Sequence, residues 1–405
     1  MKFSNSSILV FFVFIIYPLG ALPLIIIEIY NKKNYAFNYL AVFMGLFAYL
    51  WIPSGDLSRI QEDFDIIKTK EFLDLFSVIS LDYMYNVILY IFGRLNLDFA
   101  FVRFSICIIS YLFYFEIIKK IILKNKNISS SRLISFLVFL IIFFLMRFAG
   151  YLTGVRFTLA TSLFLYGFFN VIYNSNKNGW YYVISACLVH FSFWIPFLVM
   201  LFNKLLKFSF SRLSGFLLIS SSLFLSTYLI SYIIGILPIN DLLKAYLENY
   251  TIGFFASEEY ELRSLLFRIS KFFSTFIIYP ATIFVFLTNR GMSKYKIFIM
   301  FTIILSLLYN MNSAYARYAF ISIFVFTITF LVHYNKTNIN MFFLLLLCSF
   351  ITYSNSVYVN KRELSAGMQY KILYSPLPVI LSSEYDKKWI GDNISKNGSM
   401  TKFQK

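Results

Sequence analysis

Long apolar runs without charged residues alternate with short polar segments along this 405-residue chain. Several runs have about 17–25 residues, which is long enough for a helix to cross the hydrocarbon core of a bilayer. The runs are continuous rather than alternating, so they predict helices and not the strands of a membrane barrel. We expect ten spans, near residues 8–29, 36–52, 98–118, 133–148, 157–173, 213–237, 265–288, 297–311, 317–334 and 340–357.

Two further apolar stretches do not fit a regular span. The stretch 81–93 is short and contains an aspartate, and the stretch 180–203 has a histidine and a proline in its middle. We interpret 81–93 as a shallow or re-entrant element, and 180–203 as a broken hairpin or another irregular element, which is tolerated at membrane depth only where it lines a cavity. No linker divides the chain, so we expect one transmembrane domain over residues 1–357 and a C-terminal tail over 358–405.

The composition agrees with this pattern. The chain is 59% hydrophobic, and its mean hydropathy is +0.72. Only 14% of its residues are charged, whereas about 25% are charged in soluble domains. These values predict an all-α, polytopic integral membrane protein of about ten transmembrane helices, with one or two re-entrant or broken elements. Cys107, Cys187 and Cys348 all lie inside apolar runs and show no disulfide or metal spacing. We expect them to be small buried hydrophobes, and we expect no metal or other cofactor.

The net charge of +17 raises the possibility of a nucleic-acid partner. Most of this charge lies in short loops between spans, where the positive-inside rule explains it, so no nucleic-acid partner is expected. The basic segments 119–132 and 289–296 are therefore predicted to face the cytoplasm. The acid-rich loops 53–74 and 238–263 are predicted to lie outside the cytoplasm.

Several arginines fall on the outer side in this topology, where the positive-inside rule disfavours them. Arg147 ends one predicted span and Arg156 begins the next, with no acidic residue between them. Two such guanidiniums repel unless an anion joins them, and arginine presents a fork of donors that suits phosphate. The alternative is that these arginines reach toward lipid headgroups. A further outer turn places Arg317 between two tyrosines, which are common at membrane interfaces and also suit sugar rings.

Two other positions could carry chemistry. Asp56 and Arg59 are three residues apart and would share one face of a helical turn, either as a solvated pair or as a polar rim at the mouth of a cavity. His190 lies in the middle of an apolar stretch, where it is either a core residue or a functional one, because ionisable groups inside membranes are functional candidates. The sequence contains no phosphate-binding loop, zinc-ligand cluster or hydrolase nucleophile motif.

The order of several short motifs resembles a known family. Gly55-Asp56 with Arg59 is followed by "DYMYNVI" at 82–88, "GVRFTLATSLFL" from 154, "VHFS" from 189 and "ARYAF" from 316. This order is similar to that of the EpsG-like branch of the bacterial polysaccharide polymerases, the O-antigen polymerases called Wzy. The resemblance covers roughly residues 40–330 and rests on the order and spacing of the motifs.

The resemblance implies a glycosyltransferase of the bacterial inner membrane with its active site facing the periplasm. Such an enzyme joins oligosaccharide repeat units carried on undecaprenyl pyrophosphate, with membrane lipid around it and a chain-length regulator and a flippase as possible partners. Arg156 would stabilise the leaving pyrophosphate. His190 would take the proton from the acceptor hydroxyl, since imidazole titrates near neutral pH, and Asp56 is its competitor. The residues expected to bind the pyrophosphate and sugars are Arg317, Arg147, Arg59, Asp82, Tyr83, Tyr315 and Tyr318.

Two other functions stay open at this point. An O-antigen ligase uses the same donor, but it would normally carry one large periplasmic loop. A polysaccharide flippase or other transporter should show about twelve regular spans in two related halves, and no such repeat is visible in the sequence.

Overall fold

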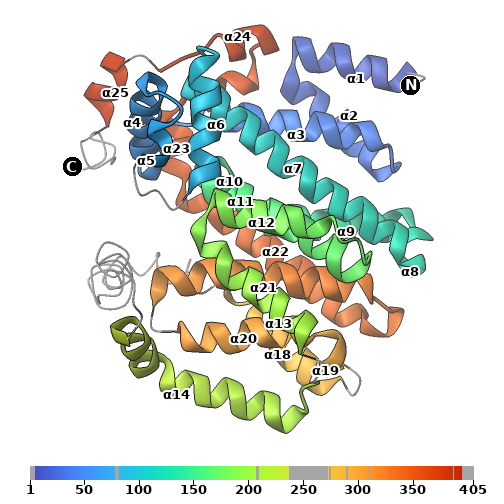
Figure 1. The fold of residues 1–405 in the computed structure, drawn as a ribbon. Coiled ribbons are helices and arrows are strands. Elements are labelled where there is room, and N and C mark those ends of the chain that lie inside the picture. Colours follow the sequence, from blue (N-terminus) through green and yellow to red (C-terminus); the bar gives the residue numbers. More distant parts are fainter. Residues whose placement is uncertain are drawn as a thin grey trace. The chain divides into compact units, whose positions relative to one another are not determined.

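The computed structural model describes residues 5–77, 82–206, 209–236, 275–288, 291–309, 311–385 and 387–394, together with Phe272. All regular elements in these ranges are helices (Figure 1), so the all-α class is confirmed for the described part of the chain. The chain divides into two compact units, one made of residues 1–194 and 356–405 and the other of residues 195–355. The predicted outer loop 238–263 lies outside the described residues, as does the first part of the predicted span 265–288.

The first unit contains most of the helices. In chain order they are α1 (Asn5–Ile16), α2 (Pro18–Tyr30), α3 (Asn34–Tyr49), α4 (Asp56–Thr69), α5 (Asp74–Ser77), α6 (Tyr83–Arg94), α7 (Phe99–Lys124), α8 (Lys126–Ser129), α9 (Arg132–Leu145), α10 (Phe148–Thr153), α11 (Val155–Tyr173), α12 (Gly179–Val189), the 3₁₀ helix η1 (Phe191–Phe193), α23 (Lys361–Ala366), η3 (Met368–Leu373), α24 (Leu377–Leu381) and α25 (Lys387–Asn393).

The first predicted span, residues 8–29, is broken into two helices. The helix α1 ends at Ile16, and α2 begins at Pro18. Proline at the first position of a helix is favourable, because its missing N–H would have no intrahelical acceptor there. Tyr17 between them has φ −151° and ψ 86°, so the chain turns at this residue.

The acid-rich segment 53–74 is mainly helical rather than a loop. Its helix α4 buries one apolar face, and its charged residues lie on the opposite side. The buried positions are Leu57, Ile60, Phe64 and Ile67. Their spacing follows the helical repeat, and the helix packs against α6.

Four helices, α3, α7, α11 and α12, form the core of the first unit. Helix α3 packs along α7, α7 along α11, and α11 along α12 (Figure 1). The last two approach closely, because a Cβ on Gly167 would lie 2.7 Å from the carbonyl oxygen of Gly179 and 2.7 Å from a Val183 methyl group. Glycines at both positions therefore let the two backbones touch, which fixes the start of α12 relative to α11.

The predicted tail folds back on the first unit. Helix η3 packs against α2 and α3, and α24 packs against α1 and α3. The Tyr49 hydroxyl donates to the Leu381 carbonyl at 2.6 Å, and the Tyr385 hydroxyl donates to the Leu50 carbonyl at 2.9 Å. The end of α3 is thus held to the tail by two tyrosines.

The second unit carries the remaining helices. Helix α13 (Trp194–Leu205) leads into it, and α22 leads out of it into the first unit. The others are α14 (Arg212–Ile236), α18 (Ile278–Leu287), α19 (Gly291–Lys294), α20 (Lys296–Leu307), α21 (Asn312–Val332), η2 (Lys336–Asn338) and α22 (Ile339–Val359). Helix α20 packs between α14 and α21 in this unit.

Three helices in the described part of the chain are long and apolar enough to cross a membrane: Val155–Tyr173, Ala314–Val332 and Lys336–Val359. Shorter apolar helices of 10–17 residues cover several other predicted spans, so the count of ten stays a prediction. Large apolar side chains are exposed on many helices. Phe343, Leu347 and Phe350 on α22 are each more than half exposed, and Phe224 on α14 is 84% exposed. Exposed apolar surface on this scale is compatible with a lipid surround.

The irregular character predicted for 180–203 is confirmed. Helix α12 ends at Val189, His190 adopts an extended conformation with φ −149° and ψ 116°, and η1 follows before α13. The buried cysteines are also confirmed, since Cys107, Cys187 and Cys348 are all buried free thiols.

Candidate functional site

Three of the residues singled out from the sequence meet in the first unit. Arg156 lies in the first turn of α11, Asp82 directly precedes α6, and His190 stands in the break between α12 and η1. The Arg156 Nη1 donates to Asp82 Oδ2 at 3.0 Å. The other carboxylate oxygen, Asp82 Oδ1, accepts from the backbone N–H of Phe191 at 3.0 Å. One carboxylate therefore ties the starts of α6 and α11 to the break beside His190.

The charges of this cluster are unequally exposed. The Asp82 side chain is 9% exposed, whereas the Arg156 side chain is 38% exposed. The guanidinium also lies over the Tyr85 ring, 5.8 Å from its centroid. Among the described residues, Asp82 is the only hydrogen-bond acceptor of Arg156, although a guanidinium has five N–H donors. The anion that the sequence predicts beside Arg156 is thus partly supplied by Asp82, and donors remain for a second anion.

His190 is held by its own turn. Its side chain is buried, and Ser192 presents both the backbone N–H, at 3.3 Å, and the hydroxyl oxygen, at 3.1 Å, to Nδ1. Phe157, which follows Arg156 on α11, meets the imidazole edge-to-face at a centroid distance of 5.7 Å. Phe191 stacks on the ring at 5.3 Å. The aromatic contacts fix the plane of the imidazole next to the Arg156–Asp82 pair.

The two contacts from Ser192 favour different tautomers of His190. The backbone N–H of Ser192 can only donate, so this contact requires an unprotonated Nδ1 and places the ring proton on Nε2. The hydroxyl can instead accept from a protonated Nδ1, which leaves the Nε2 lone pair to take a proton. The turn therefore supports a hydrogen-bond donor or a base at Nε2, according to which Ser192 contact is made.

The start of α11 is fixed by a short polar motif. The Gly150 carbonyl accepts from the Gly154 N–H at 3.0 Å and from the Thr158 hydroxyl at 3.1 Å. A Cβ on Gly154 would lie 2.7 Å from that carbonyl oxygen, so only glycine fits without a backbone shift. This arrangement begins the helix at Val155, one residue before Arg156, and aims the Arg156 side chain toward Asp82.

The other predicted site residues of the first unit do not contact Arg156, Asp82 or His190 through an interaction described here, although Tyr83 is the chain neighbour of Asp82. Asp56 and Arg59 form an ion pair with each other in the first turn of α4, and their side chains are 68% and 72% exposed. Arg147 is half-buried at the start of α10, with φ 11°. Tyr83 is the residue after Asp82, and its side chain is 39% exposed. Their roles stay predictions.

Arg317, Tyr315 and Tyr318 belong to α21 in the second unit. Tyr318 is buried, Arg317 is half-buried, and the Tyr315 ring meets that of Tyr309 edge-on at 5.8 Å. Their predicted part in binding the pyrophosphate and sugars stays a prediction.

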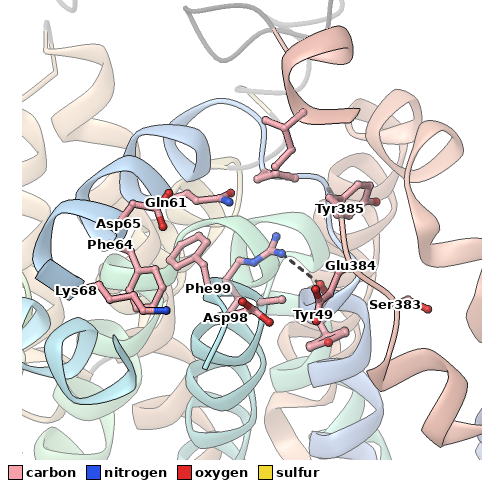
Figure 2. Close-up of a pocket in the computed structure, with 14 residues that line it drawn as sticks. Tyr49, Gln61, Phe64, Asp65, Lys68, Asp98, Phe99, Ser383, Glu384 and Tyr385 are labelled. Carbon is pink, nitrogen blue, oxygen red and sulfur yellow. Dashed lines mark hydrogen bonds between the residues drawn. The ribbon is translucent and has the colours of Figure 1, made fainter. Parts of the chain in front are cut away.

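A second polar site in the first unit was not predicted. A cavity of about 270 Å³ lies between α4, the start of α7 and residues 383–385 of the tail (Figure 2). Its lining includes Asp98, Arg103 and Glu384. Arg103 is a charged residue inside an apolar run, so the rule that singled out Arg156 would also have found it. No group of three or more potential metal ligands exists among the described residues.

Comparison of this chain with protein-family models, with curated proteins and with solved structures finds no match. The chemistry of the two sites must therefore be argued from their own geometry.

Proposed function

We propose that this chain is a bacterial surface-polysaccharide polymerase that joins oligosaccharide repeat units carried on a lipid pyrophosphate. The observation that carries the proposal is the Arg156–Asp82–His190 cluster. It combines a partly exposed guanidinium that has unused donors with a buried histidine, at a break between helices. Irregular backbone of this kind is expected where a membrane protein lines a substrate site.

In the proposed reaction, Arg156 binds an oxygen of the leaving pyrophosphate while Asp82 keeps the guanidinium in place. The acceptor hydroxyl attacks the anomeric carbon, and the carbon–oxygen bond to the pyrophosphate breaks with its electron pair. Negative charge builds on the leaving oxygen, so a fixed donor beside it stabilises the transition state. The remaining N–H groups of Arg156 suit this task because a guanidinium binds phosphate oxygens in pairs.

His190 would take the proton of the acceptor hydroxyl at Nε2. This role requires the tautomer in which Nδ1–H donates to the Ser192 hydroxyl, as the 3.1 Å contact allows. Ser192→Ala removes that acceptor and keeps the backbone N–H, which favours the opposite tautomer. If His190 is the base, Ser192→Ala lowers the rate of elongation and His190→Gln abolishes it. If His190 only donates a hydrogen bond, Ser192→Ala has no effect on the rate, and Asp56 becomes the candidate base.

The activity is tested with the purified full chain in lipid vesicles and lipid-linked repeat units. Products carrying two or more repeat units on one lipid support the polymerase. Transfer of repeat units to lipid A-core would instead indicate the ligase, and movement across the bilayer without bond formation would indicate the flippase. Either result would overturn the proposal.

Arg156 is tested by substitution in the same assay. Lysine can keep the ion pair with Asp82 but loses the planar fork of donors, and alanine loses both. We expect Arg156→Ala to slow elongation by about a hundredfold to a thousandfold, as for the loss of one charge-stabilising donor, and Arg156→Lys to be intermediate. Arg132, an exposed arginine at the start of α9, is the matched control for both substitutions. Full activity of Arg156→Lys would mean that the arginine only ties helices together.

A further inference from the structure

The cavity between α4, α7 and the tail has the features of a ligand site. Figure 2 shows Gln61, Asp65 and Lys68 of α4 on one side and residues 383–385 on the other. Asp98 and Phe99, at the start of α7, lie between these two sides. Its volume of about 270 Å³ is just below the range of about 300–1,000 Å³ found for pockets of drug-sized ligands. A ligand of one or two sugar rings is therefore a reasonable size.

Arg103 is a buried charge that lines this cavity without a carboxylate partner. The residue is 4% exposed, and no carboxylate of the described residues lies within 4.0 Å of its guanidinium nitrogens. Its Nη1 donates to the Trp51 carbonyl at 2.6 Å and its Nη2 to the Tyr49 carbonyl at 3.2 Å. Its Nε has no hydrogen-bond partner in the described part of the chain. A buried donor left unpaired is costly, so the Arg103 guanidinium is incompletely hydrogen-bonded where the residue lines the cavity.

A pair of carboxyl groups stands in the same cavity. Asp98 and Glu384 line the same cavity, and the neighbouring Asp98 carboxyl raises the pKa of Glu384 above its ordinary value. The other charged groups of the lining are Asp65 and Lys68 of α4 and Arg103 of α7. The acidic and basic groups nearly balance, so a strongly charged ligand would meet repulsion from one set or the other.

Aromatic side chains complete the lining. Phe64, Phe99, Tyr49 and Tyr385 line the cavity beside the polar groups. Rings of this kind pack against the apolar faces of sugars, while carboxylates accept hydrogen bonds from hydroxyl groups. We propose that this cavity binds an uncharged, hydroxyl-rich sugar ring through the Asp98–Glu384 pair, the aromatic lining and the Arg103 guanidinium. The further assignment of this sugar as the acceptor in polymerisation rests on the proposed function. The binding of a sugar in the cavity does not.

Tyr85 lies beside the Arg156 cluster, with the Arg156 guanidinium over its ring. This side chain of α6 is buried, and it interacts electrostatically with both Arg103 and Arg156. Its hydroxyl has no hydrogen-bond partner among the described residues. One buried residue of α6 thus interacts with a guanidinium of each site.

The inference is tested by binding of soluble sugars to the purified full chain, measured by saturation-transfer NMR. The probes are the methyl glycosides of neutral hexoses, 6-deoxyhexoses and N-acetylhexosamines, with glucosamine as the cationic probe and glucuronate as the anionic one. We expect at least one neutral glycoside to bind. Asp98→Asn and Glu384→Gln are each expected to weaken its binding by about tenfold or more, since a hydrogen bond to a charged group contributes about 1.5–3 kcal/mol. The matched control is Glu71→Gln, an exposed carboxylate of the same unit outside the cavity lining.

Several results would overturn the inference. These are binding of none of the neutral glycosides, binding of the charged probes alone, and equal binding by the Glu384→Gln and Glu71→Gln variants. Asp98 and Glu384 are exposed, so their variants should fold, and an unchanged melting temperature verifies this. If Glu384→Gln leaves the KM for the acceptor unchanged in elongation, the assignment of this cavity as the acceptor site is refuted and the polymerase is left intact. Glycoside binding without any elongation would refute the polymerase and leave the sugar site intact.

Discussion

The Asp82→Asn substitution probes the junction of α6, α11 and the His190 turn without changing its volume. The two oxygens of Asp82 accept from two different donors, the Arg156 guanidinium and the Phe191 N–H, each at 3.0 Å. An asparagine has one oxygen and one NH₂ group. Whichever way its amide is turned, one of the two donors faces another donor. The variant must therefore lose at least one hydrogen bond to a carboxylate that is 9% exposed.

The size of the effect follows from burial. Hydrogen bonds to charged groups contribute about 1.5–3 kcal/mol, and the partial exposure of Arg156 favours the lower end of this range. Asp56→Asn is the matched control, because it also removes a carboxylate from an ion pair with an arginine. Both partners of that pair are more than two-thirds exposed, and such pairs contribute about 1 kcal/mol or less.

The assay compares the melting temperatures of the two variants and the exchange of backbone amides over residues 186–194. Asp82→Asn should lower the melting temperature more than Asp56→Asn, and it should speed exchange at the Phe191 amide. Equal melting temperatures, with unchanged exchange around His190, would refute the idea that Asp82 organises this turn.

Three other predictions concern packing, the tail and topology. Gly167→Ala should lower the melting temperature, because its methyl group would meet Gly179 and Val183 at 2.7 Å and overpacking costs about 1–3 kcal/mol; Gly391→Ala, with open space around the Cβ, should not. The raised pKa of Glu384 means that the folded state favours the protonated group, so its contribution to tail docking is present at low pH. This contribution is lost as pH rises above the ordinary glutamate range, so amide exchange over 383–385 should accelerate there in the wild type and not in Glu384→Gln. A membrane-impermeant thiol reagent on intact spheroplasts should label Glu71→Cys and not Lys126→Cys in a cysteine-free background, and the reverse pattern would contradict the predicted topology.

The apolar runs predict the larger helices well, because each run is a local property of the sequence. The span expected at 157–173 is the helix Val155–Tyr173, and the break in 180–203 falls at His190. The failures have local causes too. The charges of segment 53–74 predict a loop, although its apolar residues recur at helical spacing, and Pro18 marks the division of the first span.

The candidate site could be predicted only in part. Arg156 and His190 stand out because an ionisable residue in an apolar run is unusual. Their meeting at Asp82 depends on how α6, α11 and α12 pack, which no local pattern reveals. The cavity is a harder case, since Asp98 and Glu384 come from segments far apart in the chain. Glu384 is an ordinary charged residue in a polar segment, so nothing around it indicates a partner.

The discontinuous first unit has a consequence for biosynthesis. Residues 195–355 form a unit of their own and leave the ribosome before residues 383–385 do. Arg103 must therefore fold while the wall of its cavity that carries Glu384 and Tyr385 has not yet been made. During this interval the guanidinium has its two backbone acceptors from the end of α3, which are already translated. The nascent chain thus has a way to shelter the charge before the cavity closes, and a ribosome stalled before Tyr385 would hold a chain whose cavity lacks one wall.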